Sequence, residues 1–199
     1  MTAPPYATWQ LENVTTTSKG AKIAKVTSSS GAQYCRWRPS AALRAPFGLS
    51  SFDKVANPTR LNLDLVLDDP VVLREAEELD KWAVEYLVEH GERLFGRKMS
   101  EKQVSSSYVP CARPSKDQRY APTLKVKANT NGPSAIRFWD AEGQPAEQPA
   151  NWRDVKLNVL LTVSHAWFMK GDFGLTLLAT DAMIIPNVSP PRECPFTSV

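Results

Sequence analysis

The chain has 199 residues, of which 42% are hydrophobic and 23% are charged, a composition typical of one globular domain. No run of about 18 apolar residues occurs, which argues against a membrane span, and the first residues lack the basic-then-apolar order of a secretion signal. We therefore expect an intracellular protein without a membrane partner. The three cysteines lie far apart, without the spacing of a zinc site or a disulfide framework, so no cofactor is expected.

The net charge is only +3, but charge is segregated along the chain. Residues 68–96 carry nine acidic and three basic side chains, whereas residues 97–127 carry eight basic and two acidic ones. We call Arg97–Lys127 the basic segment. Such segregation predicts a positive surface that attracts an anionic ligand, although a solvated loop is the plainer interpretation of a charge run.

The first third of the chain combines a polar arm with short strands. Residues 1–20 are rich in Pro, Thr and Ser and predict a flexible N-terminal arm. Weak alternation predicts strands at 21–28 and 33–39. The pattern at 60–67 is clearer, because four leucines alternate with other residues and so share one face of a strand.

One long helix is expected over about residues 70–95. Asp69 followed by Pro70 is a helix start, since an acid caps the free N–H groups and proline suits the first turn. Apolar residues then recur at steps of three and four, and acidic residues, Asp80 among them, are assigned to the outer faces. His90 falls on the apolar stripe and is expected to be packed in the core.

The second half of the chain predicts four more strands, at 124–128, 135–140, 154–165 and 173–185. Residues 167–172 are expected to form a loop or hairpin. The predicted fold class is therefore mainly β with one long helix, and the natural candidate is an oligonucleotide-binding (OB) barrel with extensions. The OB domain is expected over 21–186 and a flexible tail over 187–199.

Catalytic motifs are missing from the sequence. It holds no nucleophile elbow, phosphate-binding loop, dinucleotide fingerprint or zinc-protease motif. A two-metal nuclease site would need a cluster of carboxylates, for which the candidates are Asp140, Glu142, Asp154 and Asp172. These residues lie mainly at turns, where acidic residues are common for other reasons. We do not expect an enzyme.

A binding surface has more support, because proteins that hold single strands combine basic grooves with aromatic faces for stacking. Basic and aromatic residues interleave in this way at several places in the chain. Burial in the core is the alternative for each aromatic, and is favoured for Phe138, Trp152 and Phe173. The candidate nucleic-acid-binding residues are Arg36, Trp37, Arg38, Lys98, Lys102, Arg113, Lys116, Arg119, Tyr120, Lys125, Lys127, Trp139, Trp167 and Lys170.

Several motifs resemble the single-stranded-DNA-binding proteins of nucleocytoplasmic large DNA viruses, which are related to that of short-tailed bacteriophages. They are APFGLSSFDK, NPTRLNLDL, RLFGRK, YVPCARPSKDQRYAPTLKVK, FWDAEGQP and GDFGLTLLATDAMII. The resemblance implies an OB barrel that coats single-stranded DNA during replication, recombination or repair, at a nuclear or cytoplasmic replication site in an infected host. It implies that Lys125 and Lys127 belong to a basic strand and Trp167 to an aromatic loop.

The tail departs from the phage pattern, because it holds no acidic run. The resemblance therefore does not imply that this tail recruits replication proteins, or that the protein dimerises by exchanging tails. A homo-oligomer and RNA as the ligand both stay open. The alternative to nucleic-acid binding is a viral structural or protein-interaction β-domain.

Overall fold

The computed structural model describes residues 5–32, 34–51 and 58–186, so the predicted C-terminal tail lies outside the described residues. Its helices are α1 (Pro70–Glu89), α2 (Gly91–Phe95) and α3 (Glu101–Ser107), with 3-10 turns at Pro5–Thr8 and Trp152–Asp154. Its strands are β1 (Trp9–Leu11), β2 (Thr15–Thr16), β3 (Lys22–Ser28), β4 (Arg36–Trp37), β5 (Leu43–Arg44), β6 (Leu49–Ser50), β7 (Arg60–Val66), β8 (Ala112–Arg113), β9 (Thr123–Asn129), β10 (Arg137–Trp139), β11 (Pro145–Ala146), β12 (Val155–Met169) and β13 (Asp172–Pro186).

Five strands close into a ring. The neighbours run β5–β7–β9–β13–β12 and β12 returns to β5, and within this ring only the β9–β13 pair is parallel. This is the partly open five-stranded barrel of the OB fold, so the predicted fold class, mainly β with one long helix, is confirmed. The helix lies between the second and third ring strands, and not between the third and fourth, where OB barrels commonly carry it.

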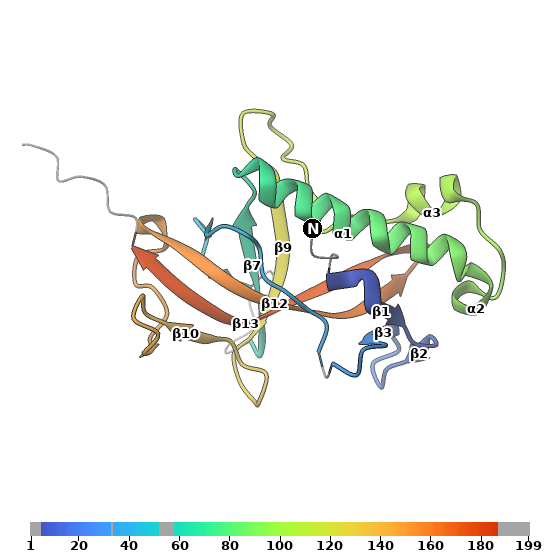
Figure 1. The fold of residues 1–199 in the computed structure, drawn as a ribbon, viewed down its shortest axis with the longest axis horizontal. Coiled ribbons are helices and arrows are strands. Elements are labelled where there is room, and N and C mark those ends of the chain that lie inside the picture. Colours follow the sequence, from blue (N-terminus) through green and yellow to red (C-terminus); the bar gives the residue numbers. More distant parts are fainter. Residues whose placement is uncertain (1–4, 33, 52–57, 187–199) are drawn as a thin grey trace, which may run out of the picture.

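The β12–β13 hairpin extends well beyond the ring (Figure 1). Sequence patterning ends the first of these strands at His165, but β12 continues to Met169. The reason is an additional partner: β3 pairs with His165–Phe168 on one edge while β13 pairs on the other. Both neighbours satisfy the backbone there, so the chain stays extended until the turn at Lys170 and Gly171.

The core follows the alternation that the sequence predicts. Leu63 and Leu65 of β7, Leu124 and Val126 of β9, and the alternate residues of β12 all point inward and are buried. Each buried leucine stabilises the fold by about 1.5–3 kcal/mol. The opposite faces of β7 and β9 remain available to solvent.

Helix α1 lies across the hairpin, and Val72, Ala76 and Leu79 begin its buried stripe (Figure 1). Asp69 caps it by accepting a hydrogen bond from the Val71 N–H at 2.8 Å. The prediction of one continuous helix over 70–95 is wrong at its end, because the helix is interrupted there: α1 ends at Glu89 and α2 begins at Gly91. Glycine weakens a helix by about 1 kcal/mol relative to alanine, which favours a break at this position.

Two further segments differ from the sequence-based expectation. The basic segment is not simply a loop, because it contains α3, whose start has a reciprocal capping box between Ser100 and Gln103. Part of the arm expected to be flexible forms β1, where Trp9 and Leu11 are buried. Trp9 packs edge-on against Trp82 of α1, with ring centroids 5.8 Å apart.

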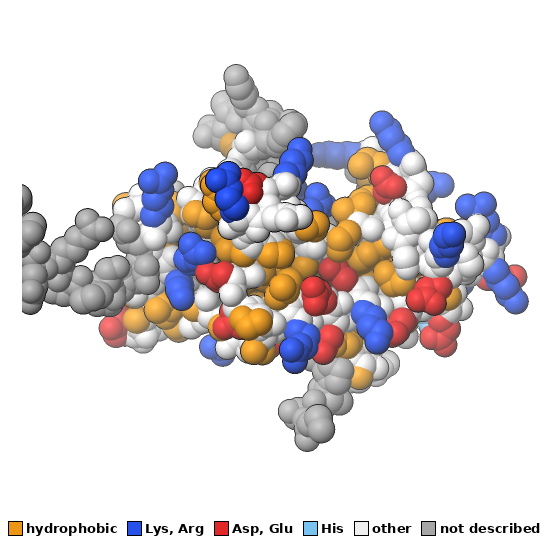
Figure 2. Space-filling model, turned by 90° about the horizontal axis from the view of Figure 1, so that it is seen from above, with side chains coloured by type: hydrophobic (Ala, Val, Ile, Leu, Met, Phe, Trp, Pro, Cys, Tyr) orange, Lys and Arg blue, Asp and Glu red, His pale blue; other side chains and the backbone are white. Residues whose placement is uncertain are grey.

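The outer surface on the α1 side carries mixed charge. Figure 2 shows Asp and Glu side chains beside Lys and Arg across this face, with hydrophobic patches between them. None of the helices formed by the described residues has the length and apolar character needed to span a membrane.

Candidate functional site

A row of polar side chains covers the outer face of β7 and β9. Because side chains alternate along a strand, the residues between the buried leucines of β7 face outward. Asn62 pairs across the ladder with Lys127, and Asp64 pairs with Lys125. Each lysine Nζ donates to its partner, Lys125 to the Asp64 carboxylate and Lys127 to the Asn62 carbonyl oxygen.

This face is the floor of the main groove, which has a volume of about 810 Å³. One wall comes from the β12–β13 hairpin and another from the segment between α3 and β8. The described residues that line it are Ser50, Ser51, Arg60, Asn62, Asp64, Val109, Pro110, Cys111, Arg113, Lys125, Val126, Lys127, Trp167, Met169, Leu175 and Thr176. Four of these residues are cationic and one, Asp64, is acidic, so the groove suits an anion.

Trp167 sits in the hairpin wall opposite Gly174 of β13. A Cβ atom at position 174 would lie 3.0 Å from the Trp167 ring and 2.6 Å from the Val109 carbonyl oxygen. Glycine therefore lets the hairpin and the Val109 segment approach closely. The Val109 N–H completes this contact by donating to the Phe173 carbonyl oxygen at 2.8 Å. Trp167 is half-buried and is one of the residues that line the groove.

Asp80 of α1 anchors the other wall. Its carboxylate accepts hydrogen bonds from the Tyr108 hydroxyl at 2.7 Å, the Cys111 N–H at 2.9 Å and the Ala112 N–H at 3.2 Å. The expectation that Asp80 lies on an outer helix face is wrong, because its exposed fraction is only 8%. Burial raises the pKa of Asp80, while the hydrogen bonds from Cys111, Tyr108 and Ala112 act against that rise. Burial and the nearby Asp80 charge raise the pKa of the Cys111 thiol, which stays protonated.

The floor of the groove carries a positive potential. Burial, followed by the positive charges of Arg60 and Arg113, lowers the pKa of Lys127 below the ordinary value of a lysine. Cations from β7, β8 and β9 therefore act on one another in a confined space. Such a cluster is stabilised when an anionic ligand supplies the opposite charge.

The structure brings together some of the predicted site residues, namely Arg113, Lys125, Lys127 and Trp167. Trp37 is only 7% exposed and belongs to the core, so its expected role as a stacking surface is wrong. Arg36 and Arg38 border a different pocket of about 390 Å³ whose lining includes Glu75 and Glu78. The acidic residues there offset the arginines.

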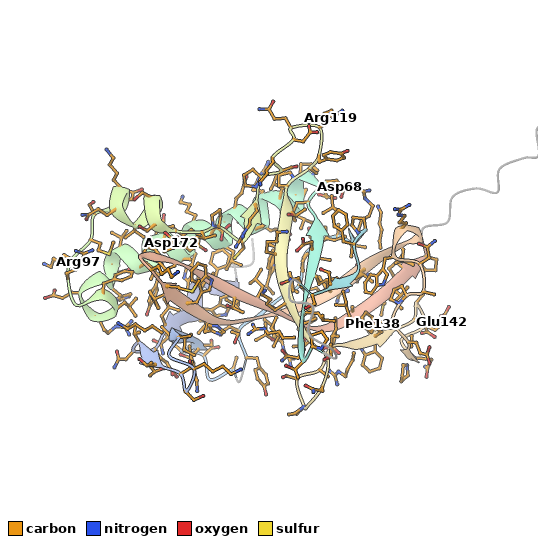
Figure 3. The ribbon with its side chains drawn as sticks, turned by 180° about the vertical axis from the view of Figure 1, so that it is seen from behind. Asp68, Arg97, Arg119, Phe138, Glu142 and Asp172 are labelled. Carbon is orange, nitrogen blue, oxygen red and sulfur yellow. The ribbon has the colours of Figure 1, made fainter. Side chains whose placement is uncertain are left out.

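The remaining predicted residues lie elsewhere. Trp139 is half-buried and donates from Nε1 to the Asp181 carboxylate at 3.0 Å, with the Arg137 guanidinium 5.6 Å from its ring centroid. Arg119 pairs with Asp117 at 2.6 Å and points outward at the tip of its loop, away from Asp172 at the hairpin turn (Figure 3). Arg119 is not among the described residues that line the main groove. The same holds for four other exposed residues, namely Lys98, Lys102, Lys116 and Tyr120. Lys170 lines a second cavity at the hairpin turn.

Sequence reasoning missed Arg60, Asn62 and Asp64 as site residues, although the alternation of β7 places them opposite its leucines. It also missed Met169, which is 64% exposed. In the part of the chain that the structure describes, no three His, Cys, Asp or Glu side chains come together in a way that would hold a metal ion.

Comparisons with known proteins are limited to structure. No family model matches the chain, and a search of curated proteins finds no match. The single-stranded DNA-binding protein from bacteriophage Enc34, solved in complex with ssDNA, is similar at 10% identity and a TM-score of 0.49, over 91% of this chain and 98% of that one. The gp2.5 single-stranded DNA binding protein of bacteriophage T7 is similar at 14% identity and a TM-score of 0.48, over 77% and 93%. The barrel of this chain is defined by its own strand pairing.

Proposed function

We propose that the protein binds single-stranded DNA in the main groove with little sequence preference. One observation carries this proposal: the groove combines a cationic floor with an aromatic residue, Trp167, in its wall. The cations of the floor are Arg60, Arg113, Lys125 and Lys127. The cations neutralise phosphates, and the ring stacks on a base. Every base has a stacking face, so stacking does not select a sequence.

The position of the groove on the barrel supports the same proposal. OB barrels bind oligonucleotides and oligosaccharides on the face of their second and third strands, between the 1–2 and 4–5 loops. Here β7 and β9 are the second and third ring strands, and Met169 lies beside the turn that joins the fourth and fifth. The excess of cations favours the oligonucleotide. A single strand is favoured over a duplex because a duplex hides its base faces within the stack.

A protein that coats single strands without reading sequence serves replication, recombination and repair alike. The resemblance of the sequence motifs to viral proteins of this kind supports such a role. Competition between oligo-dT and oligo-U for the same groove would show whether RNA is an equal ligand, since only RNA carries the 2′-hydroxyl.

Tryptophan fluorescence tests the proposal directly. Oligo-dT should quench the wild-type emission, and affinity should fall between about 50 mM and about 200 mM salt, with a log–log slope of about −3 for four neutralised phosphates. Trp167→Ala should lose most of the quench and weaken binding about tenfold or more, because one stacked base contributes about 1–3 kcal/mol. Trp152→Phe is the control, since Trp152 packs against Phe138 with ring centroids 6.0 Å apart, outside the groove. Absence of binding, or binding that ignores salt, would overturn the proposal.

Alkaline pH provides a separate expectation for Lys127. Its pKa is lowered by burial and by Arg60 and Arg113, so it loses its positive charge earlier than an ordinary lysine as pH rises. Affinity for oligo-dT should therefore begin to decline at a lower pH than the ordinary lysine pKa of about 10.4 would produce. Lys127→Arg keeps its charge throughout this rise in pH and should flatten the decline. Fluorescence anisotropy of a labelled oligonucleotide measures the affinity of the wild type and of Lys127→Arg at each pH. An equal decline in affinity for the two proteins would contradict the role of Lys127 in binding.

A further inference from the structure

A second cavity lies at the turn of the β12–β13 hairpin, and we call it the tip cavity. It has a volume of about 610 Å³. Its cations are Lys22 of β3, Arg97 after α2, and Lys170 in the turn, and Asp172 is the acidic residue among the described lining residues. Phe95 and Phe168 contribute apolar surface between these charges. The cavity thus repeats the combination of cations and aromatic rings that characterises the main groove.

Met169 connects the two sites. It lines both the main groove and the tip cavity, and 64% of it is exposed. Trp167 lies two residues earlier on the same strand face, as the two-residue period of a strand requires. Phe168 also lines the tip cavity, and because side chains alternate along a strand, it faces the side opposite Trp167. A single strand that stacks on Trp167 therefore reaches the tip cavity by passing over the exposed Met169 at the end of the hairpin.

Lys170 occupies an unusual backbone conformation. Its φ is 53° and that of Gly171 is 97°, so both turn residues are left-handed, as in the two-residue turns that favour Asn-Gly. Lysine is disfavoured there relative to asparagine or glycine. A residue kept in a disfavoured conformation often serves a function, and Lys170 is one of the residues that line the tip cavity.

We infer that the tip cavity takes the next nucleotides of the same single strand, so that the binding site has two parts joined over Met169. Lys170, Arg97 and Lys22 neutralise phosphates in the second part. This inference rests on the proposed function of the main groove. A short oligonucleotide fills the main groove alone, and a longer one occupies both parts.

The test compares oligo-dT lengths from about 4 to about 16 nucleotides, the range of site sizes of OB folds. The double variant Lys170→Asn/Arg97→Gln removes two cations, and asparagine suits the left-handed turn, so the fold is retained. The variant should bind the shortest oligonucleotides like wild type and the longest ones at least fivefold more weakly. Its salt slope should be smaller by about 1.4 for the long oligonucleotides only.

The control variant Arg74→Gln/Lys81→Gln removes the same charge from exposed positions on α1 and should change affinity at no length. Equal weakening at every length would show a long-range charge effect and would overturn the two-part site. An unchanged long-oligonucleotide affinity, together with weaker binding of oligo-glutamate, would overturn it in favour of an acidic protein partner. Loss of all binding in the wild type would instead refute the proposed function itself.

Discussion

Replacing Lys125 and Lys127 together with alanine is expected to weaken binding of oligo-dT about 100-fold. Hydrogen bonds to charged groups contribute about 1.5–3 kcal/mol each, and about 1.4 kcal/mol is a tenfold change in affinity. Both side chains point away from the core on β9, so the fold should be retained. The salt slope should fall by about 1.4, because two fewer phosphates are neutralised. Titrations at several salt concentrations measure both effects.

Two further variants make this expectation specific to the groove. Arg74→Ala/Lys81→Ala removes the same charge from the exposed surface of α1 and should leave the slope unchanged. Asp64→Asn should act in the opposite direction and tighten binding, because the Asp64 carboxylate holds the Lys125 ammonium and repels phosphate. A loss of affinity in the α1 variant equal to that in the β9 variant would show that net charge, and not the groove, determines binding.

Asp80→Ala is expected to lower the free energy of unfolding by about 3 kcal/mol, because it leaves buried donors without an acceptor and each such donor costs about 1–3 kcal/mol. The donors are the Tyr108 hydroxyl and the backbone N–H groups of Cys111 and Ala112. Asp80→Asn should cost less, since its amide oxygen still accepts. Urea denaturation followed by circular dichroism gives these differences, provided that the denaturant slope is unchanged.

Glu77 is the matched control for Asp80, because it is an exposed acid on the same helix. Glu77→Ala should change stability by no more than about 0.5 kcal/mol. Asp80→Ala should also weaken binding of oligo-dT under conditions where the protein remains folded, because Asp80 holds the Val109–Arg113 wall in place. An Asp80→Ala protein that is as stable as wild type would show that other contacts hold this wall.

Four of the five ring strands and the long helix were predictable because their signals are local, whereas β5, only two residues long, was not predicted. Leu63 and Leu65 alternate with polar residues, and a strand with one buried face requires that period. Asp69 and Pro70 likewise mark the start of α1 through groups within one turn of it. The start of α3 was detectable as well, since Ser100 and Gln103 have the spacing of a capping box, but its basic composition led to the expectation of a loop.

The residues that sequence reasoning misplaced are those whose environment is set by distant parts of the chain. Trp37 and Tyr120 have similar local surroundings in the sequence, yet Trp37 is 7% exposed and Tyr120 is 67% exposed. Asp80 has the spacing of an exposed helical acid, and it is buried because Cys111 and Ala112 return to it from more than 30 residues away. No local pattern carries that information.

The sequence by itself therefore determined the mainly β fold class and the long helix, because hydrophobic period and capping act over a few residues. Only the tertiary structure decided which strands are neighbours in the ring. That choice places Arg60 of β7, Arg113 of β8 and Trp167 of β12 around the lysines of β9, and leaves Arg36 beside Glu75 and Glu78. A groove is a property of neighbouring strands, and their pairing depends on backbone hydrogen bonds and core packing between segments far apart in the chain.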